Sequence, residues 1–170
     1  LEDRIKEELE AMRMAIINQL QKGRRAGEKD LEEILQEFKR QAKIKLSVED
    51  YETHFQLGLA FLEQGLADEA IEEFMISAQS PEKALESCTL IAEACRRKKD
   101  YAEAIRWLEK CQEICFDDPE KLHSLEYEIA SLYEKMQERQ KALSLYNKIL
   151  KWNASFRDVA KRVAALQRAS

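Results

Sequence analysis

Apolar residues recur every three or four positions along most of the chain, which is the spacing of one face of an α-helix. Two such stripes fall in the first 46 residues and are separated by a basic, glycine-containing break at 23–27. The first stripe contains Leu1, Ile5, Leu9, Met12, Ile16 and Leu20, and the second contains Leu31, Ile34, Leu35 and Phe38. We therefore expect residues 1–46 to form an antiparallel helical hairpin.

The near-heptad spacing of residues 1–22 also fits a helix that dimerises or docks on a partner. A structural self-assembly domain built on this segment is therefore an alternative for the function. We expect a monomer, with a dimer through residues 1–22 as the alternative. In both interpretations the segment is helical.

The remaining chain contains an internal repeat, which becomes visible when it is aligned on Ala70, Ala104 and Ala142, at spacings of 34 and 38 residues. An aliphatic residue and then a small one precede each alanine, a packing residue lies nine positions before it, and a large residue lies four positions after it. These positions hold Leu57-Gly58, Ile91-Ala92 and Ile129-Ala130; Phe61, Cys95 and Tyr133; and Phe74, Leu108 and Tyr146. The pattern predicts a pair of antiparallel helices in each repeat, which approach closely at the small residues.

Residues with capping side chains predict where several helices begin. Asp100 with Glu103 predicts the second helix of the second repeat, and Ser80 and Asp118, each followed by proline, predict two further starts. Ser47 with Asp50 predicts a helix from near Val48.

The end of the chain has a similar signal. Ser155 with Asp158 predicts a final helix from Phe156 to about Arg168, with its apolar stripe at Phe156, Val159, Ala160 and Val163.

In this register the segments 51–80, 85–118 and 123–154 resemble tetratricopeptide repeats, whose 34-residue period they share. The resemblance is strongest in FQLGLAFLEQGLADEAIEEF at 55–74. The third segment lacks the usual closing proline and follows four extra residues. The resemblance implies an all-α, right-handed superhelical solenoid of helix-turn-helix repeats at 47–154. Residues 1–46 would form its amino-terminal cap, and 155–170 its carboxy-terminal capping helix.

Composition agrees with an all-helical chain, because 4 glycines and 2 prolines are too few to punctuate a many-stranded sheet. The formal net charge is −5, and residues 47–80 carry eight acidic and no basic side chains. This balance argues against binding to a phosphate backbone, so we expect no nucleic-acid partner. No apolar run is long enough to span a membrane. We expect a cytoplasmic protein that does not insert into membranes.

Residues that could support catalysis are sparse. His54 and His123 begin helices of different repeats and have no nucleophile at a suitable spacing, so we expect partly buried structural histidines. Gly23 and Gly27 lie in a basic turn that is not a phosphate-binding loop. We therefore expect no enzymatic activity and no cofactor.

All four cysteines, Cys88, Cys95, Cys111 and Cys115, fall in the second repeat. None has the two-residue spacing of a zinc knuckle, and Cys95 and Cys111 occupy positions where the other repeats have packing residues. We therefore expect buried thiols. A metal or redox module built on these cysteines remains an alternative function.

The tetratricopeptide resemblance implies that the first helix of each repeat lines a concave groove for a peptide or helix of a partner protein. The residues placed there are Glu52, Phe55, Gln56, Leu59, Leu62 and Glu63, then Thr89, Glu93, Arg96 and Arg97, and finally Tyr127, Ser131 and Lys135. Phe55, Leu59 and Tyr127 are the expected solvent-facing anchors. Alternatively, the hairpin covers Leu62 or fills the groove, and the convex helices bind the partner around Glu72, Arg106 and Lys148.

Two segments, EDYETHFQLGLAFLEQGLADEAIEEF and FRDVAKRVAAL, are also similar to repeat modules of bacterial cell-polarity and pilus-motility adaptors. Some of these adaptors bind a Ras-like small GTPase. The resemblance implies a small-GTPase surface as one class of partner.

Overall fold

The computed structural model describes residues 50–168, together with Ala11 and Met14, so the predictions for the hairpin at 1–46 and for Ser47 lie outside the described residues. The described part of the chain consists of α-helices and turns and contains no strand. The chain divides after Lys83 into two compact units.

The first unit contains one described helix pair, α3 (Tyr51–Glu63) and α4 (Ala67–Ser77). The two helices cross at Gly58, where a Cβ atom would lie 2.6 Å from the ring of Phe74. Phe74 is fully buried, so its ring has little room to move. Glycine is therefore required at Gly58 for the helices to approach as closely as they do.

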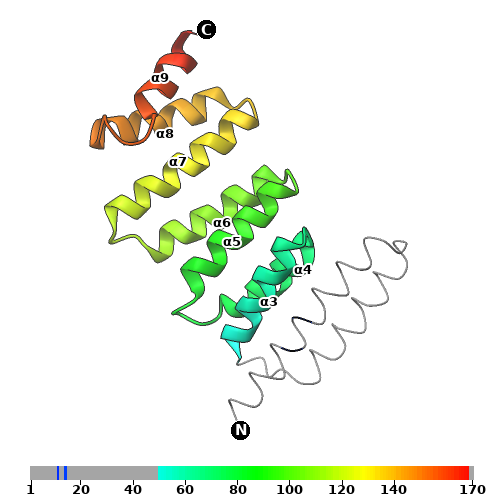
Figure 1. Cartoon of the computed structure of the whole chain (residues 1–170). Coiled ribbons are helices and arrows are strands. Elements are labelled where there is room, and N and C mark those ends of the chain that lie inside the picture. Colours follow the sequence, from blue (N-terminus) through cyan, green and yellow to red (C-terminus); the bar gives the residue numbers. More distant parts are fainter. Residues whose placement is uncertain (1–10, 12–13, 15–49, 169–170) are drawn as a thin grey trace, which may run out of the picture. The chain divides into compact units, whose positions relative to one another are not determined.

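The second unit contains five helices, in which successive antiparallel helices pack side by side (Figure 1). Their bounds are α5 (Ala84–Arg97), α6 (Tyr101–Ile114), α7 (Pro119–Lys135), α8 (Arg139–Trp152) and α9 (Val159–Arg168). The pairs α5–α6 and α7–α8 are the second and third repeats. Helix α9 packs on α8.

Burial confirms the register of the repeat. The aligned alanines Ala70, Ala104 and Ala142 are buried, and so are the small residues on the first helices and the large residues Phe74, Leu108 and Tyr146. Each pair therefore has the same packing order, with a small residue on the first helix and a large one on the second.

Capping side chains confirm two of the predicted starts. Asp100 accepts a hydrogen bond from the Glu103 amide at 3.1 Å, and Asp118 accepts one from the Lys121 amide at 3.1 Å, with Pro119 as the first residue of α7.

Helix α3 begins at Tyr51, and Asp50 is its cap. Two other predicted starts are wrong. Ser80 begins a turn closed by the Lys83 amide, and α5 starts at Ala84. The Asn153 side chain binds the Ser155 amide in a turn, so α9 starts at Val159 and not at Phe156. Within α9, Val159 and Val163 are buried whereas Ala160 is exposed.

The four extra residues before the third repeat lengthen its first helix. Helix α7 has 17 residues, against 13 in α3 and 14 in α5. Because an α-helix has 3.6 residues per turn, the insertion adds about one turn at the amino end of α7 and leaves the Ala130 crossing in register.

The turn within each repeat has one conformation in all three. Gly65, Lys99 and Gln137 have φ values of 81°, 64° and 63°. The amide of the following residue then bonds the carbonyl five residues earlier, in the pairs Leu66–Phe61, Asp100–Cys95 and Glu138–Tyr133, each at 2.9 Å. This Schellman arrangement ends the first helix and requires a left-handed residue.

Glycine at the left-handed positions of the second and third repeats should stabilise them. Lys99→Gly and Gln137→Gly each remove a Cβ that is unfavourable at positive φ, partly offset by the larger entropy of glycine in the unfolded chain. We expect each to raise the free energy of unfolding by about 0.5 to 1 kcal/mol in urea titrations. Lys99→Ala is the control, because it removes the side-chain charge but keeps the Cβ. An equal gain in that control would contradict the conformational explanation.

Candidate functional site

Residues predicted to line the groove from α3 differ in exposure. Glu52 and Glu63 are exposed, and Gln56 and Leu59 are partly buried. Phe55 and Leu62 are buried, with exposed fractions of 4% and 5%. The expectation that Phe55 is a solvent-facing anchor is therefore wrong.

Phe55 belongs to the core of the first unit. Its ring lies 5.8 Å from the Phe74 ring, measured between centroids, and the Lys83 ammonium lies 4.5 Å from its centroid. Lys83 also pairs with Glu52 at 2.8 Å. The stem and charge of Lys83 thus cover an aromatic ring that the resemblance placed at the surface.

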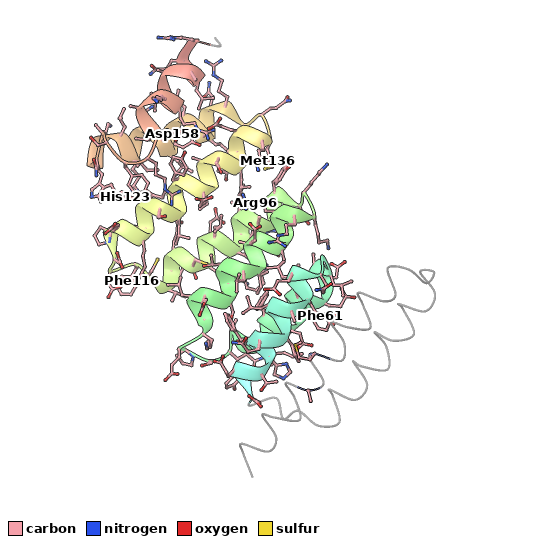
Figure 2. The ribbon with its side chains drawn as sticks, in the orientation of Figure 1. Phe61, Arg96, Phe116, His123, Met136 and Asp158 are labelled. Carbon is pink, nitrogen blue, oxygen red and sulfur yellow. The ribbon has the colours of Figure 1, made fainter. Side chains whose placement is uncertain are left out.

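The charged groove residues on α5 are at the surface. Thr89, Arg96 and Arg97 are exposed and Glu93 is partly buried. The Glu93 carboxylate accepts hydrogen bonds from Arg96 Nε at 2.6 Å and from Arg97 Nε at 3.0 Å. One carboxylate therefore orients two guanidinium groups. Arg96 lies near the carboxyl end of α5 (Figure 2).

On α7, Lys135 is exposed, Ser131 is partly buried and Tyr127 is buried, with 8% of its surface exposed. The Tyr127 ring packs edge-on against Tyr146 at 5.4 Å between centroids, and its hydroxyl donates a hydrogen bond to Asp158. The expectation that Tyr127 is a solvent-facing anchor is wrong, because residues beyond α8 cover it.

The Tyr127–Asp158 contact is part of a polar network that attaches α9. Arg162 of α9 donates to Asp158 at 3.1 Å and to Glu134 of α7 at 3.3 Å. The hydrogen bonds from the Tyr127 hydroxyl and then from Arg162 hold the pKa of Asp158 below its usual value. Burial, followed by the bond to Asp158, raises the pKa of Tyr127.

One buried position of the first helix, sixteen residues before each aligned alanine, holds a titratable side chain in every repeat. We call these three positions, His54, Cys88 and Glu126, the polar slot. In the outer two repeats the partner lies on the second helix of the same pair: His54 Nδ1 contacts Glu73 at 2.5 Å, and Glu126 pairs with Lys148.

Glu126 has a second partner one turn earlier on α7. His123 Nδ1 lies 2.7 Å from the Glu126 carboxylate, and the His123 ring packs on Trp152 of α8, with 4.3 Å between ring centroids. Buried carboxylates are retained when charged or hydrogen-bonding groups satisfy them, and Glu126 has both. Lys148, expected on the convex face, is used in this cluster.

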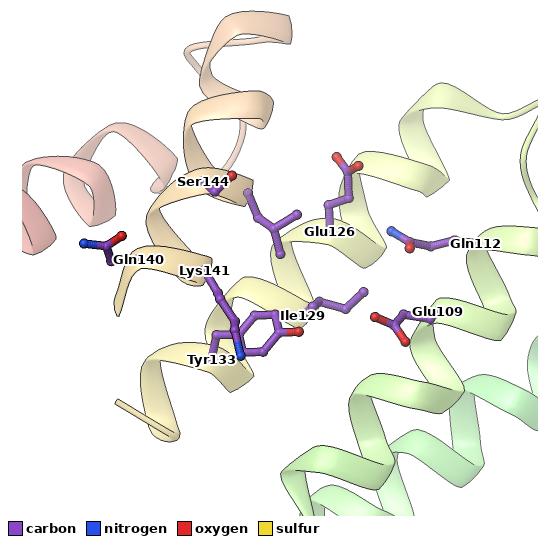
Figure 3. A pocket seen from close by; sticks show the side chains of 9 residues that line it. Glu109, Gln112, Glu126, Ile129, Tyr133, Gln140, Lys141 and Ser144 are labelled. Atoms are coloured by element: carbon purple, nitrogen blue, oxygen red, sulfur yellow. The ribbon is translucent and has the colours of Figure 1, made fainter. Parts of the chain in front are cut away.

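A surface hollow of about 430 Å³ lies beside Glu126 (Figure 3). Its walls come from α6, α7 and α8: Glu109, Gln112, Glu126, Ile129, Tyr133, Gln140, Lys141, Ser144 and Leu145. Sequence reasoning did not identify this hollow. The sequence contains one signal for Glu126, because it is a charged residue at the repeat position that His54 occupies in the first repeat. No sequence pattern indicates that Glu126 and residues of α6 line the same hollow.

The cysteines are all buried thiols, as expected. In the described part of the chain, no group of three or more His, Cys, Asp or Glu side chains is arranged to hold a metal ion. Across those same residues, no helix is both long enough and apolar enough to cross a membrane.

Removing the Tyr127 hydroxyl should raise the pKa of Asp158. The folded-state pKa of Asp158 is depressed, so its contribution to stability is present above the unfolded pKa and is lost as the pH falls through the folded pKa. In Tyr127→Phe we expect the Asp158 pKa to move toward its usual value and the free energy of unfolding at neutral pH to fall by about 1 kcal/mol. NMR titration of the carboxyl carbon and urea unfolding measure the two effects.

Tyr133→Phe is the control, because Tyr133 is on the same helix as Tyr127 but its ring lies under Lys141 of α8 and its hydroxyl does not bond Asp158. An unchanged Asp158 pKa in Tyr127→Phe would contradict the assigned hydrogen bond.

Comparison with known proteins agrees with this geometry. A family model described as tetratricopeptide repeat matches residues 85–118 and 127–156. A search of the curated proteins found no match.

Several solved structures share the fold. A crystal structure of MamA is 20% identical, with a TM-score of 0.59 over 87% of this chain and 82% of that chain. A putative kinesin light chain from Podosopora anserina with nearly identical TPR-like repeats is 18% identical, with a TM-score of 0.60 over 95% and 86%. Pseudomonas aeruginosa pilF is 18% identical, with a TM-score of 0.58 over 95% and 70%.

The matched family segments coincide with the pairs α5–α6 and α7–α8, and the pair α3–α4 has the same buried positions and the same turn. The second and third helix pairs are therefore tetratricopeptide repeats, and the described part of the chain has the all-helical fold of tetratricopeptide-repeat solenoids.

Proposed function

We propose that this chain is a non-catalytic adaptor that binds a partner protein through the first helices of its repeats. The tetratricopeptide fold supports a role in protein–protein interaction. The observation that carries the finer proposal is the exposed charged face of α5, because its arginines occupy the groove positions of the second repeat and do not contribute to the core.

The proposed recognition differs from the one expected from sequence. Phe55 and Tyr127 are core residues, so partner affinity cannot depend on them as surface anchors. Arg96 and Arg97 are instead fixed by Glu93 before a partner arrives. Pre-organised guanidinium groups recognise carboxylates with little loss of side-chain freedom, so we expect them to face an acidic segment of the partner.

Charge reversal on α5 tests this surface. In Arg96→Glu/Arg97→Glu we expect the amount of partner captured from the source organism to fall by about tenfold or more. The substitution replaces both guanidinium groups with carboxylates, which repel an acidic segment. Capture would be quantified by mass spectrometry against the unmodified chain. Circular dichroism should show that the helices are retained, because both side chains are exposed. Thermal stability should fall modestly, because Glu93 loses two ion-pair partners and gains two like charges.

The matched control is Arg106→Glu/Lys110→Glu, which makes the same change in charge at exposed positions of the second helix, α6. We expect this variant to retain the partner. Loss of binding in the control with retention in the α5 variant would move recognition to the second helices and overturn the proposed surface.

A Ras-like small GTPase is the specific partner class that we propose. Its support is the similarity of residues 49–74 and 156–166 to repeat modules of bacterial polarity and motility adaptors. Such an interaction would be expected to depend on the bound nucleotide, because the γ-phosphate orders the switch segments of these proteins.

Purified small GTPases from the source organism, loaded with GDP or with a non-hydrolysable GTP analogue, provide the direct measurement. We expect binding to the immobilised chain in one nucleotide state and at least tenfold weaker binding in the other. Absence of binding in both states would remove this partner class and leave the adaptor proposal to the capture experiment.

A further inference from the structure

The second repeat holds two thiols at the same crossing of α5 and α6. Cys111 of α6 lies against one turn of α5, with its sulfur 3.6 Å from Thr89 Oγ1 and 3.9 Å from the Leu85 carbonyl oxygen. Cys88 is on that turn, between Leu85 and Thr89 in the sequence, so both thiols belong to the same helix crossing. Both cysteines are buried, with Cys111 fully enclosed and Cys88 5% exposed.

The neighbouring repeats place this contact in a regular position. Cys88 occupies the polar slot, in which His54 and Glu126 each contact a residue of the second helix in their own pair. In the second repeat the slot residue Cys88 faces the helix that carries Cys111. The register directs Cys88 toward α6, and the contacts of Cys111 with Leu85 and Thr89 identify that thiol as its neighbour.

The surroundings make the two thiols chemically unequal. The hydrogen bond from Cys111 lowers the pKa of Cys88 to about 7, helped by the charge of Lys110 and opposed by burial. The same hydrogen bond, together with burial, raises the pKa of Cys111. Cys88 is also the less enclosed thiol, 5% exposed against 0% for Cys111. Because the thiolate is the reactive form and an oxidant must reach it, Cys88 is the nucleophile of the pair and Cys111 is the resolving thiol.

We propose that Cys88 and Cys111 form a redox-active dithiol that a small peroxide oxidises to a reversible disulfide between α5 and α6. The oxidant is a small peroxide because Cys88 is only 5% exposed, which leaves too little access for a bulky reagent.

The reaction balances in two steps. The Cys88 thiolate attacks one peroxide oxygen, the O–O bond breaks, and the departing oxygen takes up a proton, which leaves a sulfenic acid on Cys88. The Cys111 thiol then loses its proton and its sulfur attacks the Cys88 sulfur, so that an S–S bond forms and the hydroxyl leaves as water. Hydrogen peroxide gains two electrons, two thiols lose them, and two water molecules form. A thiol reductant converts the disulfide back to two thiols.

The other two cysteines provide an internal comparison. Cys95 lies two turns along α5 from Cys88, and Cys115 caps α6 four residues after Cys111. Burial, and then the negative charge of Asp118, raise the pKa of Cys115, so it is a poor nucleophile at neutral pH. Oxidation should therefore involve Cys88 and Cys111 before either of these.

The experiment uses Cys95→Ser/Cys115→Ser, because trypsin leaves Cys88 with Cys95 and Cys111 with Cys115 on shared peptides. The folded variant is treated with hydrogen peroxide at neutral pH, alkylated, digested without reductant and analysed by mass spectrometry. We expect both free thiols to disappear, a peptide linked through Cys88 and Cys111 to form, and dithiothreitol to restore both thiols. The oxidation rate should rise with pH and reach half its maximum near pH 7.

The reciprocal variant Cys88→Ser/Cys111→Ser keeps the other two thiols, and we expect no intramolecular disulfide in it. Retention of both free thiols in Cys95→Ser/Cys115→Ser while the unmodified chain forms a disulfide would overturn the proposal. Linkage that forms in denaturant but not in the folded chain would overturn it too. Because Cys95→Ser/Cys115→Ser retains the proposed pair, the test does not depend on whether the reciprocal variant folds.

Discussion

The close approach of the two helices within each repeat is the constraint on which the other features depend. A first helix can lie against its partner because a small residue stands at the crossing, and at Gly58 even one additional carbon would overlap the Phe74 ring. The crossing fixes the rotation of both helices about their axes. That rotation directs the polar slot toward the second helix and turns the Glu93, Arg96 and Arg97 side chains of the second repeat outward.

Much of this arrangement could be predicted from sequence, because small and large residues at fixed spacing are a direct record of helix packing. The same reasoning was less successful for helix starts. Asp118 and Ser80 both precede proline, yet Asp118 caps a helix whereas Ser80 begins a turn whose backbone closes on Lys83. The predicted start at Ser155 fails for a similar reason, because the Ser155 amide donates a hydrogen bond to the Asn153 side chain in a turn. The local sequence identifies side chains that could cap a helix, but which hydrogen bond forms depends on the neighbouring chain.

The candidate surface was predicted less completely than the fold. Resemblance assigns residues to a face of a helix, but exposure depends on side chains that arrive from elsewhere in the sequence. Tyr127 is covered through Asp158 and Phe156, about thirty residues later, and Phe55 is covered by Lys83. Arg96 and Arg97 of α5 are exposed, because long charged side chains remain at the surface without a distant partner.

The polar slot also determines how such a chain can be rebuilt by recombination. His54 and Glu126 each find their charged partner within their own helix pair, so a whole pair carries its solution with it when it is duplicated or moved. Exchange of a single helix would break this match: α7 without α8 would separate the buried Glu126 carboxylate from Lys148, its ion-pair partner on the second helix. The helix pair, and not the helix, is therefore the smallest piece of this protein that can be shuffled without loss.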